Sequence, residues 1–200
     1  MGSENRKSQI HTKQSDVSET VVLIVDVINP FEFDGWEQVV GRAARIASPI
    51  LELKQRAREA EVPIIYVNDN FGQWRSNSER LVEYCRTQGH ARELVERLAP
   101  QADDYFVLKP MHSGFFETPL SLLLKALRAR QLILSGLWTN SCVLFTANDA
   151  YLRDFKLSVP EDCVAAASDE DQRFGLNQMR TILKAEICSA RSARLIRGND

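Results

Sequence analysis

The sequence lacks several features that mark particular classes of protein. No apolar run approaches the ~18 residues that suggest a membrane-spanning helix, and the four cysteines form no C-x-x-C pair. Lysine and arginine total 25 against 27 acidic residues, so the basic excess typical of nucleic-acid-binding proteins is missing. We therefore expect no membrane partner and no nucleic-acid partner. We expect reduced cysteines in a cytoplasmic protein.

The chain also shows no repeat, no low-complexity tract and no Pro/Gly/Ser-rich linker. Residues 1–19 are polar, of mixed charge and without the apolar stretch of a secretory signal, so we predict a mobile, disordered tail there. Residues 20–200 are predicted to form one domain, because hydrophobic residues make up 44% of the 200-residue chain, an ordinary globular value.

Segments typical of strands alternate with segments typical of helices. The β-branched run at 21–25 is typical of a strand buried on both faces. The predicted strands are 21–25, 62–67, 105–108, 131–135, 156–159 and 186–188. The predicted helices are 37–60, about 78–99 with a break at Gly89, 120–127, 143–151 and 169–185. This alternation predicts an α/β fold, a three-layer αβα sandwich with a mostly parallel, six-stranded, Rossmann-like sheet.

Three reactive side chains follow predicted strands. Asp26 ends the first strand, Lys109 ends the third, and Cys142 follows the fourth and opens a helix. Ligands of open parallel sheets bind at the carboxyl ends of the strands. A thiol needs activation at neutral pH, which a helix N-terminus, an ammonium group and a proton-accepting carboxylate can provide. The set is therefore consistent with nucleophilic catalysis, and we expect Cys142 to be alkylated rapidly at neutral pH.

Three segments resemble motifs of the isochorismatase-like cysteine hydrolases. Residues 25–31 (VDVINPF) resemble D-x-Q-N-x-F, residues 109–120 (KPMHSGFFETPL) resemble K-x-x-x-S-A-F-x-x-T-x-L, and residues 136–143 (GLWTNSCV) resemble G-x-x-T-x-x-C-V. The order and spacing are those of the family, and the resemblance covers roughly residues 20–190. It implies the isochorismatase-like fold for this chain.

The resemblance also implies roles for individual residues. Asp26 is expected to be the base, Lys109 its electrostatic partner and Cys142 the nucleophile. A non-proline cis peptide is expected between Leu137 and Trp138. The backbone N–H groups of Trp138 and Cys142 would then form an oxyanion hole. The implied reaction is hydrolysis of a small-molecule amide or related C–N bond through a Cys142 thioester.

The sequence departs from the family pattern at several positions. Ile28 stands at the usual glutamine position, Gly114 at a common alanine position, and Asn140 where many relatives carry aspartate. The segment 68–74 has no histidine, whereas nicotinamidases of the family carry a metal-binding H-x-H pair there. The three histidines of the chain are scattered, at positions 11, 90 and 112. We therefore predict no metal and no cofactor, and we disfavour nicotinamidase activity.

Several loop residues are candidates for the substrate pocket. Phe31, Phe71, Trp74 and Phe115 follow predicted strands, and they are expected to line a pocket for a planar or apolar small-molecule substrate. The alternative is that some of them pack the loops against the core. Asp69, in this same region, is interpreted as a turn or cap residue. His112 is interpreted as a surface residue, with substrate contact as the alternative.

A strand order of 3-2-1-4-5-6 would place the third strand about 10 Å from the first. Lys109 must then reach inward over the intervening strand. Two other functions stay open on this fold: hydrolysis of an enol ether, as in isochorismatases proper, and a non-catalytic binding or assembly module. Relatives are commonly dimers or tetramers, so the resemblance also implies a homo-oligomer.

Overall fold

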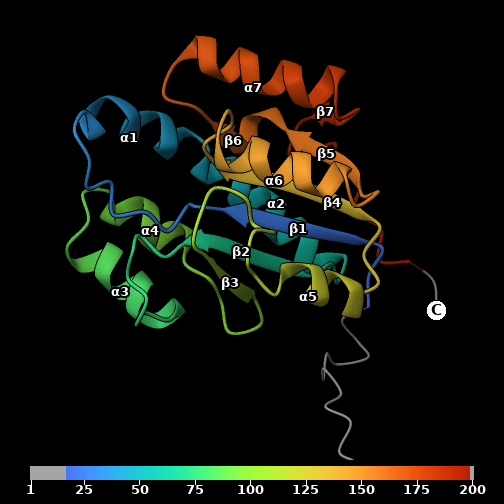
Figure 1. Ribbon diagram of the computed structural model, residues 1–200, viewed down its shortest axis with the longest axis horizontal. Helices are drawn as coiled ribbons and strands as arrows, with labels where there is room; N and C mark the ends of the chain where they lie inside the picture. The colour runs from blue at the N-terminus through green and yellow to red at the C-terminus, as the bar shows by residue number, and fades with distance from the viewer. Residues whose placement is uncertain (1–16, 199–200) are drawn as a thin grey trace, which may run out of the picture.

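The computed structural model describes residues 17–198, which form one parallel sheet with helices on both faces (Figure 1). The strand order is β3-β2-β1-β4-β5-β7, with β6 paired to β4, and every pairing is parallel. The strands are β1 (Thr20–Val25), β2 (Ile64–Asp69), β3 (Tyr105–Lys109), β4 (Gln131–Leu137), β5 (Lys156–Pro160), β6 (Val164–Ala165) and β7 (Glu186–Cys188). The predicted αβα class and the order of the six longer strands are confirmed.

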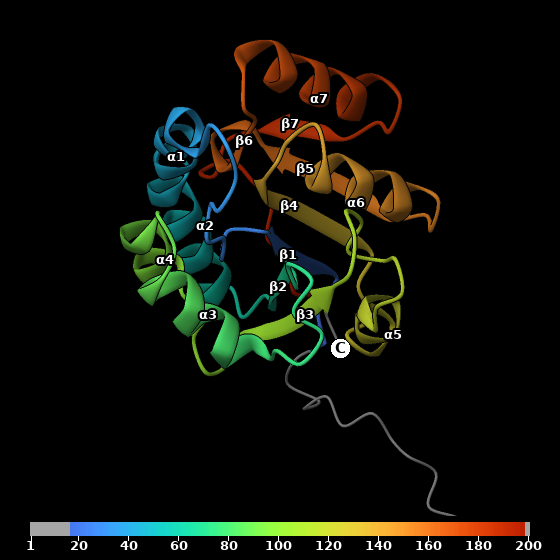
Figure 2. The same ribbon diagram turned by 60° about the vertical axis from the view of Figure 1, so that its left-hand side comes forward.

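The helices divide between the two faces of the sheet. Figure 2 shows α1 to α4 on one face and α5, α6 and α7 on the other. They are α1 (Trp36–Arg45), α2 (Ala47–Glu59), α3 (Ser78–Thr87), α4 (Arg92–Leu98), α5 (Leu120–Ala126), α6 (Cys142–Tyr151) and α7 (Asp169–Thr181), with a 3₁₀ turn, η2 (Glu161–Cys163). None of the helices between residues 17 and 198 combines the length and apolar character needed to cross a bilayer.

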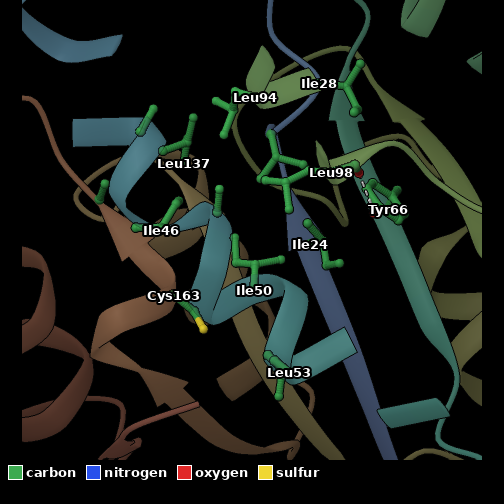
Figure 3. Packing of buried hydrophobic residues seen from close by; sticks show 14 of the residues in the cluster. Ile24, Ile28, Ile46, Ile50, Leu53, Tyr66, Leu94, Leu98, Leu137 and Cys163 are labelled. Carbon is green, nitrogen blue, oxygen red and sulfur yellow. Dashed lines mark hydrogen bonds between the residues drawn. The ribbon is translucent and has the colours of Figure 1, made fainter. Parts of the chain in front are cut away.

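Two apolar cores form because successive strand residues point to opposite faces. In β1, Val22 and Ile24 pack under α1 to α4, whereas Val21, Leu23 and Val25 pack under α5 to α7, and all five are fully buried. Figure 3 shows the first core. Burying one such side chain stabilises the fold by about 1.5–3 kcal/mol. The two cores hold the sheet between the helical layers, and the parallel register of the strands fixes where their carboxyl ends lie.

The single helix predicted over 37–60 is wrong, because the structure has two helices that meet at Ile46. A continuous helix would need an N–H at Pro49 to bond to the carbonyl of Arg45, and proline has none. Pro49 instead lies in the first turn of α2, where a missing N–H is tolerated. The apolar periodicity does not reveal this break between α1 and α2, because Ile46 and Ile50 are both buried in the same core and continue the helical spacing.

The end of the last helix and the extent of the predicted tail also differ from the prediction. The helix predicted to reach residue 185 ends at Thr181, and the chain turns away through Lys184 with φ +55°. Most of the predicted tail, residues 1–16, lies outside the described residues. Ser18, which the sequence analysis placed in the tail, is instead fully buried, and its N–H donates to the carbonyl of Leu127 at 2.9 Å.

Gly114 is expected to tolerate alanine poorly, although alanine is common at this position in the family. A Cβ at Gly114 would lie 2.6 Å from Cγ1 of Val67, which is buried in β2. We expect Gly114→Ala to lower the free energy of unfolding by about 1–3 kcal/mol. Gly41→Ala is the control: no atom lies within 4 Å of its Cβ position inside α1, so a gain of about 0.5–1 kcal/mol is expected. Equal effects in urea melts would contradict this prediction.

Candidate active site

The three reactive side chains meet at the carboxyl ends of the central strands. Asp26 follows β1, Lys109 is the last residue of β3, and Cys142 is the first residue of α6. The Nζ of Lys109 lies 2.8 Å from Oδ2 of Asp26 and 3.6 Å from Sγ of Cys142. All three residues are buried, and Lys109 has no exposed surface. An ammonium group therefore lies within contact of both a carboxylate and a thiol.

Asp69 joins this cluster, which sequence reasoning missed. Strand β2 continues to Asp69, whose register partner in β3 is Lys109. The Nζ of Lys109 lies 3.2 Å from Oδ2 of Asp69, and the N–H of Asp69 donates to Oδ1 of Asp26 at 2.6 Å. Asp69 also accepts from the N–H of Phe71, which matches the predicted turn role in part. The long Lys109 side chain thus spans β2 to reach Asp26, and this resolves the separation expected from the strand order.

Burial and charge together set the protonation of the cluster. Burial raises the pKa of Asp26, although Lys109 and the contact with Cys142 act in the opposite direction. Burial acts to lower the pKa of Lys109, but the charges of Asp26, Cys142 and Asp69 together outweigh it, so this pKa lies above its ordinary value. Burial also raises the pKa of Cys142 to about 12, the charge of Asp26 adds to this, and Lys109 counteracts it.

The raised pKa keeps Cys142 as a thiol, beside a carboxylate and an ammonium. The expected rapid alkylation at neutral pH is not supported, because burial and the charge of Asp26 both disfavour a free Cys142 thiolate. A raised pKa makes Asp26 a stronger proton acceptor than an ordinary aspartate. This arrangement favours transfer of the thiol proton to Asp26 during reaction over permanent ionisation of the sulfur.

The backbone around Asp26 is held from the neighbouring strand. Asp26 has φ +50°, a left-handed conformation that aspartate tolerates better than most residues. The side-chain amide of Asn68 accepts from the N–H of Ile28 at 3.1 Å and donates to its carbonyl at 2.8 Å. The Ile28 side chain is fully buried in the core beneath α1 to α4, so it makes no polar contact at the position where relatives carry glutamine.

The segment between β4 and α6 brings two backbone N–H groups to the site. The peptide bond between Leu137 and Trp138 is cis. The N–H groups of Trp138 and Cys142 have no hydrogen-bond partner among residues 17–198. Thr139 anchors the segment, because its N–H donates to Ala165 at 2.9 Å and its hydroxyl donates to Gln172 of α7 at 2.7 Å. The two N–H groups are thus available to a ligand, as an oxyanion hole requires.

His112 is exposed, as the surface interpretation expects, and it also lies beside the Cys142 thiol, as the alternative of substrate contact requires. Its Nδ1 is 3.8 Å from Sγ of Cys142 and 3.5 Å from Oγ of Ser141. The side chain is exposed and its ring packs against Phe145. No motif signal marks it, since it occupies an unspecified position between Lys109 and Ser113 in the family pattern.

The four aromatic residues predicted to line the pocket divide into two pairs. Phe31 is fully buried and packs edge-to-face against Trp138, with ring centroids 6.1 Å apart. Phe115 is buried in the second core beside Phe155. Phe31 has no exposed surface and therefore packs its loop against the core, the alternative that the sequence analysis left open, whereas Phe115 keeps 5% exposure, close to the 4% of Asp26. Phe71 and Trp74 are exposed.

Trp74 lines a groove beside the cluster. The groove has a volume of about 470 Å³ and begins one residue beyond Asp69 and Lys109, at Asn70 and Pro110. Its walls also include Met111 and Phe116. Within the described part of the chain, no group of three or more His, Cys, Asp or Glu side chains is arranged to hold a metal ion.

Asp26→Asn is expected to make the Cys142 thiol more acidic while it removes the base. The charge of Asp26 is the second-largest cause of the raised pKa of Cys142, so removing that charge eases ionisation of the sulfur. We expect the pH midpoint of iodoacetamide alkylation at Cys142 to fall while turnover is lost. Peptide mass spectrometry across a pH series measures this. Cys85, whose pKa burial raises to about 12, is an internal control; an unchanged or higher Cys142 midpoint would contradict the assigned cause.

Comparison with known proteins places this geometry in context. The model of the Isochorismatase domain family matches residues 20–192. An uncharacterized isochorismatase family protein, YaaI of Bacillus subtilis, is 44% identical over 170 residues, covering 85% of this chain and 93% of YaaI. Ureidoacrylate amidohydrolase RutB of Azorhizobium caulinodans is 29% identical, covering 77% and 79% of the two chains. The crystal structure of N-carbamoylsarcosine amidase from Thermoplasma acidophilum superposes with a TM-score of 0.70 at 25% identity, covering 88% of this chain and 99% of the amidase.

Proposed function

Because the chain belongs to the isochorismatase family of hydrolases, we propose that it is a metal-independent cysteine hydrolase that cleaves a small-molecule amide or related C–N bond. The single observation that carries this proposal is the buried contact of one ammonium with both a carboxylate and a thiol. Lys109 lies 2.8 Å from Asp26 and 3.6 Å from Cys142. A buried charge cluster costs desolvation energy, and here it surrounds a nucleophile at the strand ends where ligands bind.

The first half of the reaction forms a thioester. Asp26 accepts the proton of the Cys142 thiol, and Lys109 stabilises the thiolate that results. The sulfur attacks the carbonyl carbon, and the N–H groups of Trp138 and Cys142 hydrogen-bond to the oxyanion. One such donor contributes about 3–4 kcal/mol in the transition state. Asp26 returns the proton to the departing nitrogen, the C–N bond breaks, and the acyl group stays on Cys142 until water hydrolyses it.

We propose that the substrate carries a carbamoyl or similar amide group. The names of two similar proteins, ureidoacrylate amidohydrolase and N-carbamoylsarcosine amidase, both specify substrates with a carbonyl bonded to nitrogen. Trp74 and Phe71 are exposed, and the N–H of Phe71 binds Asp69 of the cluster, so these rings are suited to the apolar part of such a molecule. An amide also makes use of the thiol, whereas enol-ether hydrolysis needs only an acid.

The test is capture of the covalent intermediate. The protein is incubated with N-carbamoylglycine, N-carbamoylsarcosine and simple primary amides, and each sample is divided for amine or ammonia release and for mass spectrometry after acid quench. Release accompanied by an acyl or carbamoyl adduct on the Cys142 peptide is expected. Cleavage of a vinyl ether with no adduct would favour the enol-ether route. Tight binding of these amides without any turnover would favour a non-catalytic module.

We also propose a homo-oligomer, as the family resemblance implies. Several large apolar side chains are exposed, including Leu122 of α5, Phe145 of α6 and Leu152, which directly follows α6, and contact with a second chain would remove them from water. Light scattering coupled to size-exclusion chromatography measures the mass in solution. A monomeric mass across the accessible concentrations would exclude this assembly.

A further inference from the structure

A second proton-transfer group lies beside the nucleophile, outside the Asp26–Lys109–Cys142 cluster. The Nδ1 of His112 is 3.8 Å from Sγ of Cys142. Histidine is the side chain that most readily exchanges a proton near neutral pH. In the thioester-forming half of the proposed reaction the base is Asp26, and this imidazole has no role.

His112 is held in place by the same helix that carries the nucleophile. Its neighbour Ser113 donates a hydrogen bond to Oδ2 of Asp149 at 2.5 Å, and the N–H of Gly114 donates to the hydroxyl of Thr146 at 3.0 Å. Asp149 and Thr146 both belong to α6, which Cys142 opens. The His112 ring also packs on Phe145 of α6, with centroids 5.2 Å apart. The imidazole and the sulfur are therefore positioned relative to one another by one helix.

Asp26 and His112 differ in their access to water. Asp26 is only 4% exposed, and its two oxygens already bind the N–H of Asp69 and the Nζ of Lys109. His112 is exposed. After the amine leaves, a water molecule must approach the carbonyl carbon, which is one bond from Sγ. The exposed imidazole is open to a water molecule that arrives from solvent, whereas the carboxylate of Asp26 is buried beside the thiol.

We propose that His112 is the base that activates the hydrolytic water in the second half of the reaction, an inference that rests on the proposed thioester. The Nδ1 of the neutral imidazole accepts a proton from water as the water oxygen bonds to the carbonyl carbon. The C–S bond then breaks, the acid product is released, and His112 returns the proton to Sγ of Cys142. The two proton transfers are thus divided, with Asp26 serving acylation and His112 serving hydrolysis of the thioester.

The test separates the two half-reactions with p-nitrophenyl acetate, an ester that acylates a reactive thiol and releases a coloured product. We expect His112→Asn to keep the initial burst of p-nitrophenolate at the wild-type rate, because acylation does not need the imidazole. The later steady rate is expected to fall about 10²–10⁴-fold, the usual contribution of a general base. The acetyl adduct on Cys142 should accumulate in mass spectra. His90→Asn is the matched control, because His90 stacks on Trp36 away from this loop.

Rescue by hydroxylamine distinguishes a chemical role from a structural one. Hydroxylamine attacks a thioester without a base, so it should restore turnover of His112→Asn toward the wild-type rate. An unchanged steady rate, or a burst slowed as much as the steady phase, would overturn the assignment of His112. If neither the wild-type protein nor His112→Asn gives a burst or an adduct on Cys142, the proposed cysteine chemistry itself fails, which is a separate outcome.

Discussion

Cys142→Ala is expected to abolish hydrolysis of every amide that the wild-type protein cleaves, with the fold unchanged. The variant removes the only atom that can form the thioester, and loss of a catalytic nucleophile lowers kcat by about 10⁴-fold or more. Cys142 is buried at the start of α6, and alanine removes a single heavy atom, so it leaves little empty volume. Turnover is measured as amine release, and the fold as the thermal midpoint followed by circular dichroism.

Cys188→Ala provides the matched control for this change. Cys188 lies at the end of β7, half-buried and 3.3 Å from the hydroxyl of Ser158, and the proposed reaction does not use it. It should retain wild-type turnover. Cys142→Ser should be as inactive as Cys142→Ala, because a serine hydroxyl is a far weaker acid than a thiol and Asp26 cannot deprotonate it effectively. Substantial turnover by either Cys142 variant would exclude the thioester route.

Lys109→Met is expected to destabilise the fold and to inactivate the protein. Methionine keeps the length of the side chain but removes the cation that lies 2.8 Å from Asp26 and 3.2 Å from Asp69. Removing one partner of a buried ion pair typically costs about 3–5 kcal/mol. For a domain of this size, that cost corresponds to a fall in Tm of roughly 6–20 °C. Turnover should be lost in parallel, since the thiolate loses its counter-charge.

The pH dependence of stability and two further variants identify why Lys109→Met lowers the free energy of unfolding. Without Lys109 the pKa of buried Asp26 rises further, so the folded protein holds a proton that the unfolded chain releases near pH 4. The difference in the free energy of unfolding between wild type and Lys109→Met should therefore be smallest at low pH. It should grow as pH rises from about 4 toward the pKa of Asp26 in the folded variant. Asp26→Asn combined with Lys109→Met should recover part of the stability. Lys125→Met, at an exposed site of α5, should change it little; an equal loss there would refute the ion-pair explanation.

Much of the site was predictable because it is built from the ends of strands. The apolar run before Asp26 and the one before Lys109 each predict a strand, and the strand order then brings those ends to one edge of the sheet. The positions of Asp26, Lys109 and Cys142 follow from this topology alone. Their mutual contacts also need a side chain long enough to span β2, and lysine has that length.

The parts of the site that the sequence does not predict depend on side-chain and backbone contacts, which hydrophobic periodicity does not encode. Asp69 was assigned to a turn because Asn68 and Asp69 are polar, yet β2 includes both residues, and Asn68 is buried because its amide binds the backbone of Ile28. A polar residue can thus continue a strand where it meets a partner at the sheet's edge. The sequence left His112 between a surface role and substrate contact, because its place depends on hydrogen bonds from Ser113 and Gly114 to α6, which no local pattern encodes.

The position of β3 at the margin of the sheet affects how the protein loses activity in denaturant. β3 pairs with β2 on one side and with no strand of residues 17–198 on the other, yet its last residue supplies the ammonium on which the thiol depends. Margins of a fold open at lower free energy than its centre. In a urea titration, turnover should vanish before the far-ultraviolet dichroism of the helices changes. Loss of catalysis would then report the first loosening of this protein, well ahead of its global denaturation.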